Sequence, residues 1–122
     1  MIKGLAGASI WSEDLKKNLL PFYRDVLGLT VRIDTPGFVV FGDAEAPSLA
    51  LGTHSQVHGR NGDASRHMVG LVTDDLAKDW RRLKDAGVKF VEDPTDYTNV
   101  KLATLEDPEG NLVQLLQFAS RG

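Results

Sequence analysis

The sequence contains one pattern twice, and this repeat constrains the fold more than any other feature. In each copy an apolar stretch leads into a small hydroxyl residue, two acidic residues and a leucine. The first copy is Trp11-Ser12-Glu13-Asp14-Leu15, and the second, 61 residues later, is Val72-Thr73-Asp74-Asp75-Leu76. Apolar residues at helical spacing follow both copies and end at a glycine. A repeat of this length is one structural unit used twice, so we expect two similar modules.

Each copy predicts a helix, over residues 15–27 and 76–86. Ser12 and Thr73 are the candidate N-caps, acidic residues occupy both first turns, and Gly28 and Gly87 come just after the helices. Pro21 lies inside the first helical stretch. Because proline lacks an N–H and its ring clashes with the preceding turn, we expect it to kink this helix or split it into two pieces.

Strand-like stretches surround both helices in the same order. One precedes each helix and three follow it, at residues 6–11, 29–33, 38–41 and 48–51 in the first copy and 68–72, 88–91, 101–105 and 111–116 in the second. The predicted class is therefore α+β, as βαβββ twice. We expect one domain over residues 1–122, with module one at about 1–53, a polar linker at about 54–65 and module two at about 66–119.

Alternation along the strands predicts two different sheet faces. In the first strand Ala6, Ala8 and Ile10 alternate with a mixed set of Gly7, Ser9 and Trp11, and the fifth and last strands show the same contrast. The uniformly apolar set suits packing against a helix. Glycine in the mixed set leaves room for something to approach the backbone, so we expect a concave face with a cavity there. Phe38 and Phe41 are expected to make one face of their strand aromatic.

Composition excludes several classes of function. The chain has no cysteine, which rules out disulfides, thiolate metal sites and cysteine nucleophiles. Fourteen basic and 17 acidic residues give a net charge of −3, with the signs interspersed. We therefore expect no nucleic-acid partner and no membrane attachment by a basic patch. No stretch predicts a transmembrane span or a signal peptide, so the expected location is the cytoplasm.

Several stretches resemble a known family over nearly the whole chain, from Ala6 to Phe118. They are residues 14–15, 22–29 (FYRDVLGL), 74–76, 83–88 (LKDAGV) and 107–111 (DPEGN). Together, in a duplicated frame, they resemble the vicinal oxygen chelate superfamily, which contains glyoxalases, bleomycin-resistance proteins and extradiol dioxygenases. The resemblance implies a curled eight-stranded mixed sheet around a cavity and a homodimer.

The resemblance also implies where a metal site would be. Catalytic members hold one divalent metal with His, Gln or Glu from four strand positions. These positions correspond here to Gly7, Met68, Gln114 and a residue within about two of Leu51. Glycine and leucine have no ligand atom and a thioether suits hard cations poorly, so only Gln114 could coordinate. We therefore expect no metal and no other cofactor.

An alternative assigns a shifted metal site to two histidines. His67 is one residue from the fifth-strand ligand position, and His54 lies just after the fourth strand. A bulge that slipped the register would turn His67 and Gln114 toward one cavity. Against this, alternation places His67 on the helix side, while His54 belongs to the polar linker.

The residues expected to line a ligand cavity are Ser9, Trp11, Met68, Lys101 and Gln114. Trp11 either stacks on a planar ligand or fills the cavity end as part of the core. Lys101 opens a strand on which related proteins often carry a basic residue, and it either binds an anionic group or is simply solvated. Tyr97, in the loop before that strand, either covers the cavity mouth or is solvated.

Three functional hypotheses follow from these expectations. The first is a small-molecule binding protein without a metal, of the bleomycin-resistance type, that sequesters a planar or aromatic ligand such as an antibiotic. The second is an enzyme of the same fold: a metal-dependent lyase resembling lactoylglutathione lyase, an isomerase or a dioxygenase with a shifted site, or a metal-free enzyme that uses Gln114 and a loop residue. The third is a structural or regulatory protein whose cavity is vestigial.

Overall fold

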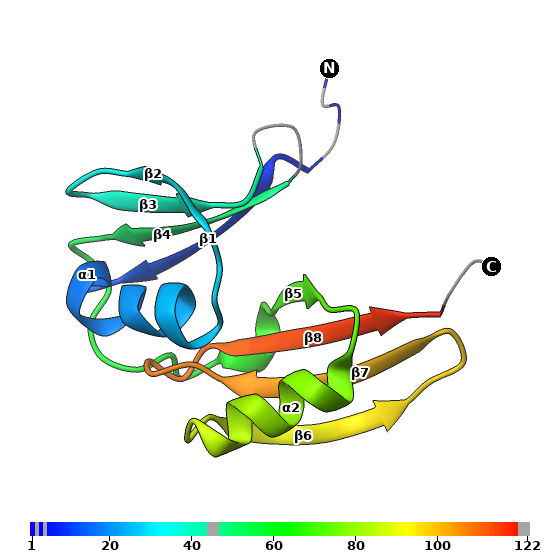
Figure 1. Ribbon diagram of the computed structural model, residues 1–122. Coiled ribbons are helices and arrows are strands. Elements are labelled where there is room, and N and C mark those ends of the chain that lie inside the picture. The colour runs from blue at the N-terminus through cyan, green and yellow to red at the C-terminus, as the bar shows by residue number, and fades with distance from the viewer. Residues whose placement is uncertain (2, 4, 44–46, 120–122) are drawn as a thin grey trace. The chain divides into compact units, whose positions relative to one another are not determined.

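A computed structural model describes residues 1, 3, 5–43 and 47–119. The chain divides into two compact units, Met1–Gly59 and Arg60–Gly122, and this boundary falls inside the stretch predicted as a linker. Each unit contains one four-stranded sheet with helical segments (Figure 1). The predicted α+β class, with the βαβββ order used twice, is confirmed.

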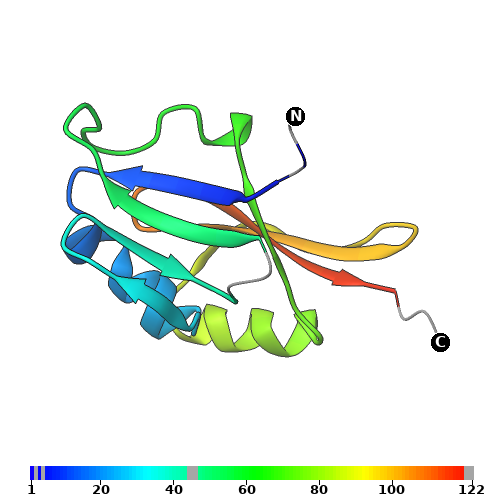
Figure 2. The same ribbon diagram turned by 90° about the horizontal axis from the view of Figure 1, so that it is seen from above.

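The first unit follows the predicted order, with its helix in two pieces. Its elements are β1 (Gly7–Ser12), α1 (Leu15–Asn18), the π-helical turn η1 (Phe22–Val26), β2 (Val31–Asp34), β3 (Phe38–Phe41) and β4 (Ser48–Thr53). The strands are ordered β1-β4-β3-β2. β1 runs parallel to β4, as Figure 2 shows, and the other neighbours are antiparallel. The sheet is therefore mixed.

The second unit repeats this topology. After the short 3₁₀ turn η2 (Ala64–Arg66) come β5 (Val69–Val72), α2 (Leu76–Asp85), β6 (Lys89–Asp96), β7 (Val100–Glu106) and β8 (Leu112–Phe118). The strands are ordered β5-β8-β7-β6, with β5 parallel to β8. The parallel pair joins the first and last strands of each unit, so the duplication in the sequence is also a duplication in space.

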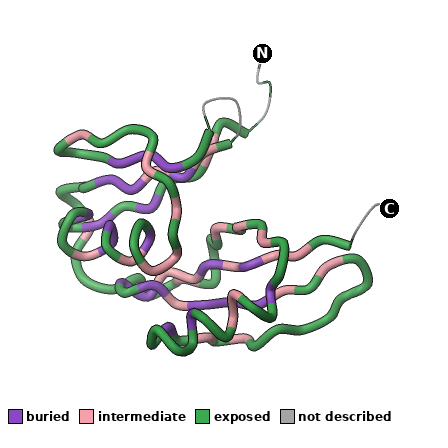
Figure 3. Tube along the Cα trace, viewed as in Figure 1, coloured by how far each residue is buried: buried purple, intermediate pink, exposed green. Residues whose placement is uncertain are grey.

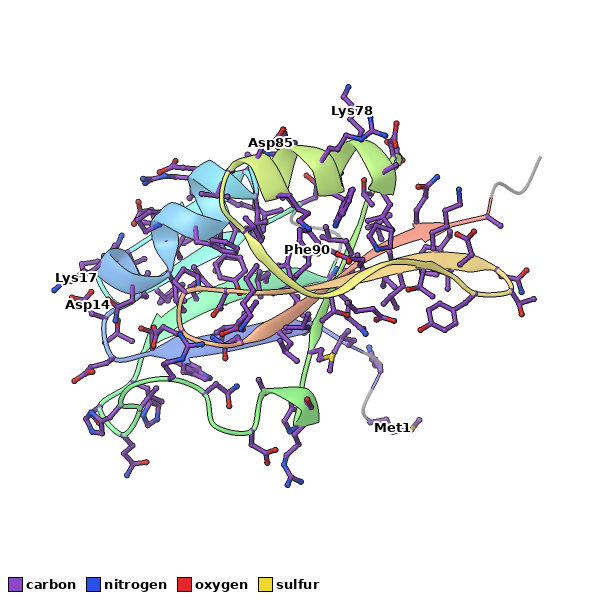
Figure 4. All side chains as sticks on the ribbon, turned by 90° about the horizontal axis from the view of Figure 1, so that it is seen from below. Met1, Asp14, Lys17, Lys78, Asp85 and Phe90 are labelled. Atoms are coloured by element: carbon purple, nitrogen blue, oxygen red, sulfur yellow. The ribbon has the colours of Figure 1, made fainter. Side chains whose placement is uncertain are left out.

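Both units bury the sheet face that alternation predicted to pack on a helix. In the first unit the buried strand residues of this face are Ile10, Val39, Phe41, Leu49 and Leu51, and the helical segments contribute Leu15, Leu19 and Tyr23. In the second unit the buried set is Ala103, Leu105, Val113 and Leu115 from the strands with Leu76 and Leu83 from α2. Figure 3 shows the buried stretches on β7, β8 and one side of α2. Lys78 and Asp85 project from the other side of α2 (Figure 4).

The helix N-caps lie two residues later than predicted. The side chains of Asp14 and Asp75 accept hydrogen bonds from the N–H groups of Lys17 and Lys78, so these aspartates are the N-caps. Asp14 and Lys17 are labelled in Figure 4. The predicted caps, Ser12 and Thr73, instead accept from the N–H groups of the aspartates, at 3.0 and 3.1 Å. Each hydroxyl therefore orders the turn before the helix, and the hydroxyl of Thr73 also donates to Asp79 in the first turn of α2.

In each unit, a side chain near the end of the last strand accepts a hydrogen bond from the first N–H of the helix. Thr53 accepts from the N–H of Leu15 at 3.1 Å, and Gln117 accepts from the N–H of Leu76 at 2.8 Å. The first N–H groups of a helix have no partner within it, so these contacts satisfy donors that would otherwise be buried without one. The same device appears at the same place in both units.

The first helix is interrupted just before Pro21, and the predicted division into two pieces is present. α1 covers only four residues, and η1 begins directly after the proline. Gly28 and Gly87, which follow the two helical stretches, have φ angles of 80° and 90°. Only glycine adopts such angles without strain, which explains why both helices end where the sequence indicated. No helix in the described ranges is long and apolar enough to cross a bilayer.

β6 is longer than predicted. The sequence indicated a strand over residues 88–91, whereas β6 continues to Asp96 through Pro94. Because β6 is the edge strand of its sheet, a residue without an N–H is tolerated there. The hairpin then closes with a hydrogen bond of 2.8 Å from the N–H of Tyr97 to the carbonyl of Val100. Tyr97 therefore lies at the base of a tight turn.

The end of the linker packs on the turn between β7 and β8. The N–H of Asn61 donates to the carbonyl of Glu109 at 2.8 Å, and its side-chain amide donates to the side chain of Asn111 at 2.9 Å. Within the turn, Asp107 is 3% exposed and accepts from the N–H groups of Glu109 and Asn111. The DPEGN stretch is thus a hydrogen-bonded turn that anchors the start of the second unit.

Candidate functional site

The sheet face of the first unit that faces away from its helical segments carries an aromatic row. The strand register places Trp11 beside Gly52 and Phe38 on the other side of the same glycine. Trp11 is 49% exposed and Phe38 is 43% exposed. Neighbouring positions in register point to the same face, so the two rings are separated only by a residue with no side chain.

Trp11 is held in a defined position although it is exposed. Its six-membered ring occupies the space above Gly52, where an added Cβ would lie 2.2 Å from a ring carbon. The imidazole of His54 contacts the indole edge-on, with ring centroids 5.7 Å apart. The ring of His54 is itself fixed, because its Nδ1 accepts from the N–H of Gln56 at 3.1 Å. Trp11 is therefore an ordered aromatic surface and not part of the buried core.

The next row along this face is smaller and less aromatic. Ser9 is exposed in the middle of β1, and the register places it beside Ala50, which is followed by Val40 and Ile33. The two aromatic residues of β3 do not share a face, which corrects the expectation for that strand. Phe41 is 2% exposed, and its ring centroid lies 6.5 Å from that of Tyr23. Phe38 is on the face that points away from the helical segments.

The resemblance places two of its four metal-ligand positions in the first unit, one on the first strand and one on the fourth. Both hold residues without ligand atoms. An added Cβ at Gly7 would lie 2.3 Å from the carbonyl oxygen of Ser48, so the backbone of β4 already occupies that space. The register pairs Gly70 with Gln114 in the second unit and Ser9 with Ala50 in the first. Ala50 on β4 therefore corresponds to Gln114 on β8. Leu51, its neighbour on β4, is fully buried on the helix side.

The corresponding face of the second unit is more polar. One row across all four strands contains Gly70, Gln114, Thr104 and Glu92. Gln114 is half-buried in the middle of β8, and its alternation with the buried Val113 and Leu115 confirms that it faces away from α2. Met68 lies one residue before β5 and is 39% exposed.

Two hydroxyl groups hold the carboxylate of Glu92. The hydroxyl of Tyr97 donates to one oxygen at 2.8 Å, and the hydroxyl of Thr104 donates to the other at 3.3 Å. The bond to Glu92 raises the pKa of Tyr97 above its ordinary value of 10.0, because the bond and the nearby negative charge both disfavour the phenolate. Thr104 is 4% exposed, so one of these donors is fixed by packing.

A second carboxylate on this face is paired with cations. Glu106 lies one row away from Thr104 and contacts the ammonium of Lys89 at 3.2 Å and the guanidinium of Arg60. The hydrogen bond from Lys89, assisted by Arg60, lowers the pKa of Glu106 below its ordinary value of 4.5. Glu106 is therefore a structural group that ties the linker and β6 to β7.

Two of the predicted site residues are not brought to these faces. Lys101 pairs with Gln117, whose side chain binds the start of α2. Lys101 is three residues from Thr104 on the same strand, so it points to the opposite face, which is the helix side. His67 is exposed and precedes β5 outside any strand. Among the residues with described positions, no group of three or more His, Cys, Asp or Glu side chains is arranged to hold a metal ion.

Sequence reasoning missed Glu92 as a member of the polar row. The predicted strand ended at Val91, so Glu92 was outside it. No alternation in the sequence identifies it, because the irregularity between Phe90 and Glu92 places these two residues on opposite faces of the sheet.

Comparisons with known proteins agree on the family. The model of the Glyoxalase/Bleomycin resistance protein/Dioxygenase superfamily matches residues 5–115. The chain is 42% identical over 121 residues to the uncharacterized protein YurT of Bacillus subtilis, covering 89% of this chain and 94% of that protein.

Solved structures support the same fold. A member of the glyoxalase/bleomycin resistance protein/dioxygenase superfamily from Sphaerobacter thermophilus has a TM-score of 0.74 at 25% identity, over 95% of this chain and 98% of that one. A glyoxalase/bleomycin resistance protein/dioxygenase from Nocardioides has a TM-score of 0.68 at 21% identity, over 100% and 88%. With this fold and the matched family model, the chain belongs to the glyoxalase/bleomycin resistance protein/dioxygenase superfamily.

Proposed function

We propose that this chain is a metal-independent binding protein for a small planar or aromatic molecule. The observation that carries the proposal is Trp11, an indole that is 49% exposed and yet fixed against Gly52 and His54. An exposed tryptophan normally costs free energy, because its apolar surface contacts water. A fixed, exposed ring next to Phe38 is what a ligand-stacking surface requires.

The physical basis of binding would be desolvation with shape selection. An aromatic ligand stacked on Trp11 would remove apolar area of both partners from water, at about 25 cal/mol for each Å². Aromatic pairs add about 0.5–1.5 kcal/mol beyond burial when they are offset-stacked or edge-to-face. Because Trp11 is already ordered, little conformational entropy would be lost on binding.

The donor set supports binding without a metal. Gly7 has no side chain, and the carbonyl of Ser48 occupies the space that a side chain would need. Ala50, which corresponds to Gln114, offers no ligand atom either. Ser9, exposed in the next row of the same sheet face, is then a polar group available to orient a ligand by hydrogen bonds, as in many small-molecule sites. The family resemblance adds a homodimer to this proposal.

The test uses tryptophan fluorescence. Trp11 and Trp80 are the two tryptophans of the chain, so Trp80→Phe leaves Trp11 as the sole reporter and Trp11→Phe leaves Trp80. Both variants are titrated with 2-naphthol, quinoline and lumichrome after treatment with EDTA. We expect at least one compound to change the Trp11 emission saturably and to leave the Trp80 emission unchanged.

Affinity is then measured by equilibrium dialysis for the wild type and Trp11→Ala. We expect a loss of about tenfold or more, equivalent to roughly 1.4 kcal/mol. Equal affinity for the two proteins would remove Trp11 from the site. Binding that appears only when a divalent metal is added back would contradict the metal-independent form of the proposal.

A further inference from the structure

The open face of the second unit, which is the sheet face away from α2, carries two glutamates in different electrostatic situations. Glu106 has two cationic partners, Lys89 and Arg60. Glu92 accepts hydrogen bonds from two hydroxyl groups, and no basic side chain of the described residues forms an ion pair with it. Its negative charge is therefore ordered but not compensated.

The hydrogen bonds to Glu92 leave a defined acceptor pattern. A carboxylate has about four lone-pair positions on its two oxygens. One oxygen accepts from Thr104 and the other accepts from Tyr97. One acceptor position therefore remains on each oxygen, so the carboxylate has capacity for two further N–H donors.

The surroundings of Glu92 suit a ligand that is mostly apolar. The next row of the open face contains Val72, Leu116 and Leu102, and Val72 is 73% exposed. Gln114 is in the same row as Glu92, beside Thr104, and adds an amide that can donate or accept. A charged group placed among apolar side chains is screened less than one surrounded by water, which strengthens its attraction for a cation.

We propose that Glu92, oriented by Tyr97 and Thr104, is a binding subsite for a cationic nitrogen group, an amidinium or an ammonium, on an otherwise apolar ligand. Gln114 contributes a second polar contact beside it. The inference rests on the proposed binding function and adds a polar subsite on the sheet of the second unit. Glu92 would bind the charged end, while neighbouring leucine side chains contact the apolar part.

The experiment compares two probes that differ in charge and hardly in shape, benzamidine and neutral benzamide. Both are titrated into labelled protein and followed by the backbone amide and indole signals in two-dimensional NMR spectra. We expect benzamidine to bind about tenfold more tightly than benzamide, because the charged hydrogen bonds exist only for the former. The shifted amides should include Gly70 and Thr104 and exclude Ala103, which faces α2.

Two variants with the same change of charge separate the subsite from the general field of the protein. Glu92→Gln keeps the size of the side chain and removes its charge. Asp93→Asn removes a charge one residue away, where the carboxylate accepts from the indole of Trp80 at 3.2 Å. We expect Glu92→Gln to bring the ratio of the two affinities close to one and Asp93→Asn to leave it unchanged.

The possible outcomes separate the cationic subsite at Glu92 from the proposed binding of aromatic molecules. Equal binding of both probes to the wild type, or a preference that survives Glu92→Gln, overturns the cationic subsite. If both probes shift the Trp11 indole signal and neither shifts the amides of Gly70 and Thr104, the aromatic binding function stands while the subsite is rejected. If neither probe binds, the subsite is rejected, and the fluorescence titrations decide the binding function separately. Should Glu92→Gln fail to fold, the map of shifted amides in the wild type gives the same decision.

Discussion

At the residue scale, a position without a side chain can decide where a neighbouring aromatic ring lies. Gly52 is the clearest case, because the ring of Trp11 occupies the space that any Cβ would take. The exposed indole can occupy this place only if that position has no side chain. Residue 52 therefore determines where the ring of Trp11 lies, although it has no side chain of its own.

Replacing Gly52 by alanine is expected to displace the indole of Trp11. In the Trp80→Phe background, the emission of Trp11 should move to longer wavelength as the ring enters water. The unfolding free energy should fall by about 1 kcal/mol, at the low end for overpacking, because the ring can move outward. Urea denaturation and emission spectra measure both effects. Gly37→Ala is the control, since an added Cβ there meets nothing within 4 Å, and an equal change in both variants would contradict this account.

The ionisation of Tyr97 reports directly on Glu92. Because the hydrogen bond to Glu92 raises the pKa of Tyr97, Glu92→Gln should lower that pKa toward its ordinary value of 10.0. In the wild type the phenolate therefore forms at higher pH than in the variant. The ultraviolet absorbance of tyrosinate during an alkaline titration measures this, with Asp93→Asn as the control. An unchanged titration of Tyr97 in Glu92→Gln would mean that the two groups are not bonded in solution.

At the scale of elements, the two helix starts use the same three-part arrangement. A hydroxyl before the helix binds the N–H of an aspartate, this aspartate caps the helix, and a side chain from the last strand binds the first helical N–H. The strand partner differs, being Thr53 in one unit and Gln117 in the other. The geometry is therefore preserved although the chemistry of the third contact is not.

Removing one cap is expected to destabilise the chain by a predictable amount. Asp75→Ala should lower the unfolding free energy by about 1 kcal/mol, within the range of roughly 0.5–2 kcal/mol typical of lost N-caps. The adjacent Asp74→Ala is a matched control, because Asp74 is exposed and its side chain makes none of the cap contacts. Denaturation in urea compares the two variants. Equal losses would show that the effect comes from charge near the helix start and not from the cap.

The sequence predicted the elements better than their ends. The repeat, the apolar alternation and Pro21 correctly indicated two βαβββ units and a divided first helix. The alternation and the proline act over a few neighbouring residues, and the repeat shows that the same local pattern occurs twice. The caps were placed at Ser12 and Thr73 because both a hydroxyl and a carboxylate can serve, and only the geometry separates them. The extent of β6 depended on its being an edge strand, which is a property of the whole sheet.

The open faces were predictable in outline only. Alternation correctly separated Trp11 and Gln114 from the helix side. Lys101 was assigned to the cavity from the family resemblance, while the register places it on the helix side. Glu92 needed the pairing between β6 and β7, with its two irregularities, before its neighbours could be known.

At the scale of the whole molecule, ionic contacts tie the linker to the second unit. Because Lys89 and Arg60 lower the pKa of Glu106, the charged form of Glu106 stabilises the folded state. This contribution is fully present above the ordinary value of 4.5 and is lost as the pH falls through the lowered pKa. Its size should be no more than about 1 kcal/mol, since both cationic side chains are largely exposed.

The expected result is a pH-dependent difference between the wild type and Glu106→Gln. The wild type should be more stable at neutral pH, and the difference should shrink as the pH falls below 4.5. Urea denaturation across the acid range measures it, with Asp74→Asn as a control of equal charge change. A difference that is constant with pH would assign the effect to packing instead of to ionisation.

The close approach of Gly7 to the carbonyl of Ser48 limits which residues position 7 can hold. Any residue other than glycine would place its Cβ 2.3 Å from that oxygen, so β4 would have to move away from β1 to admit it. The identity of residue 7 and the parallel pairing of β1 with β4 are therefore coupled: a side chain introduced at this end of β1 needs a second, compensating change in β4.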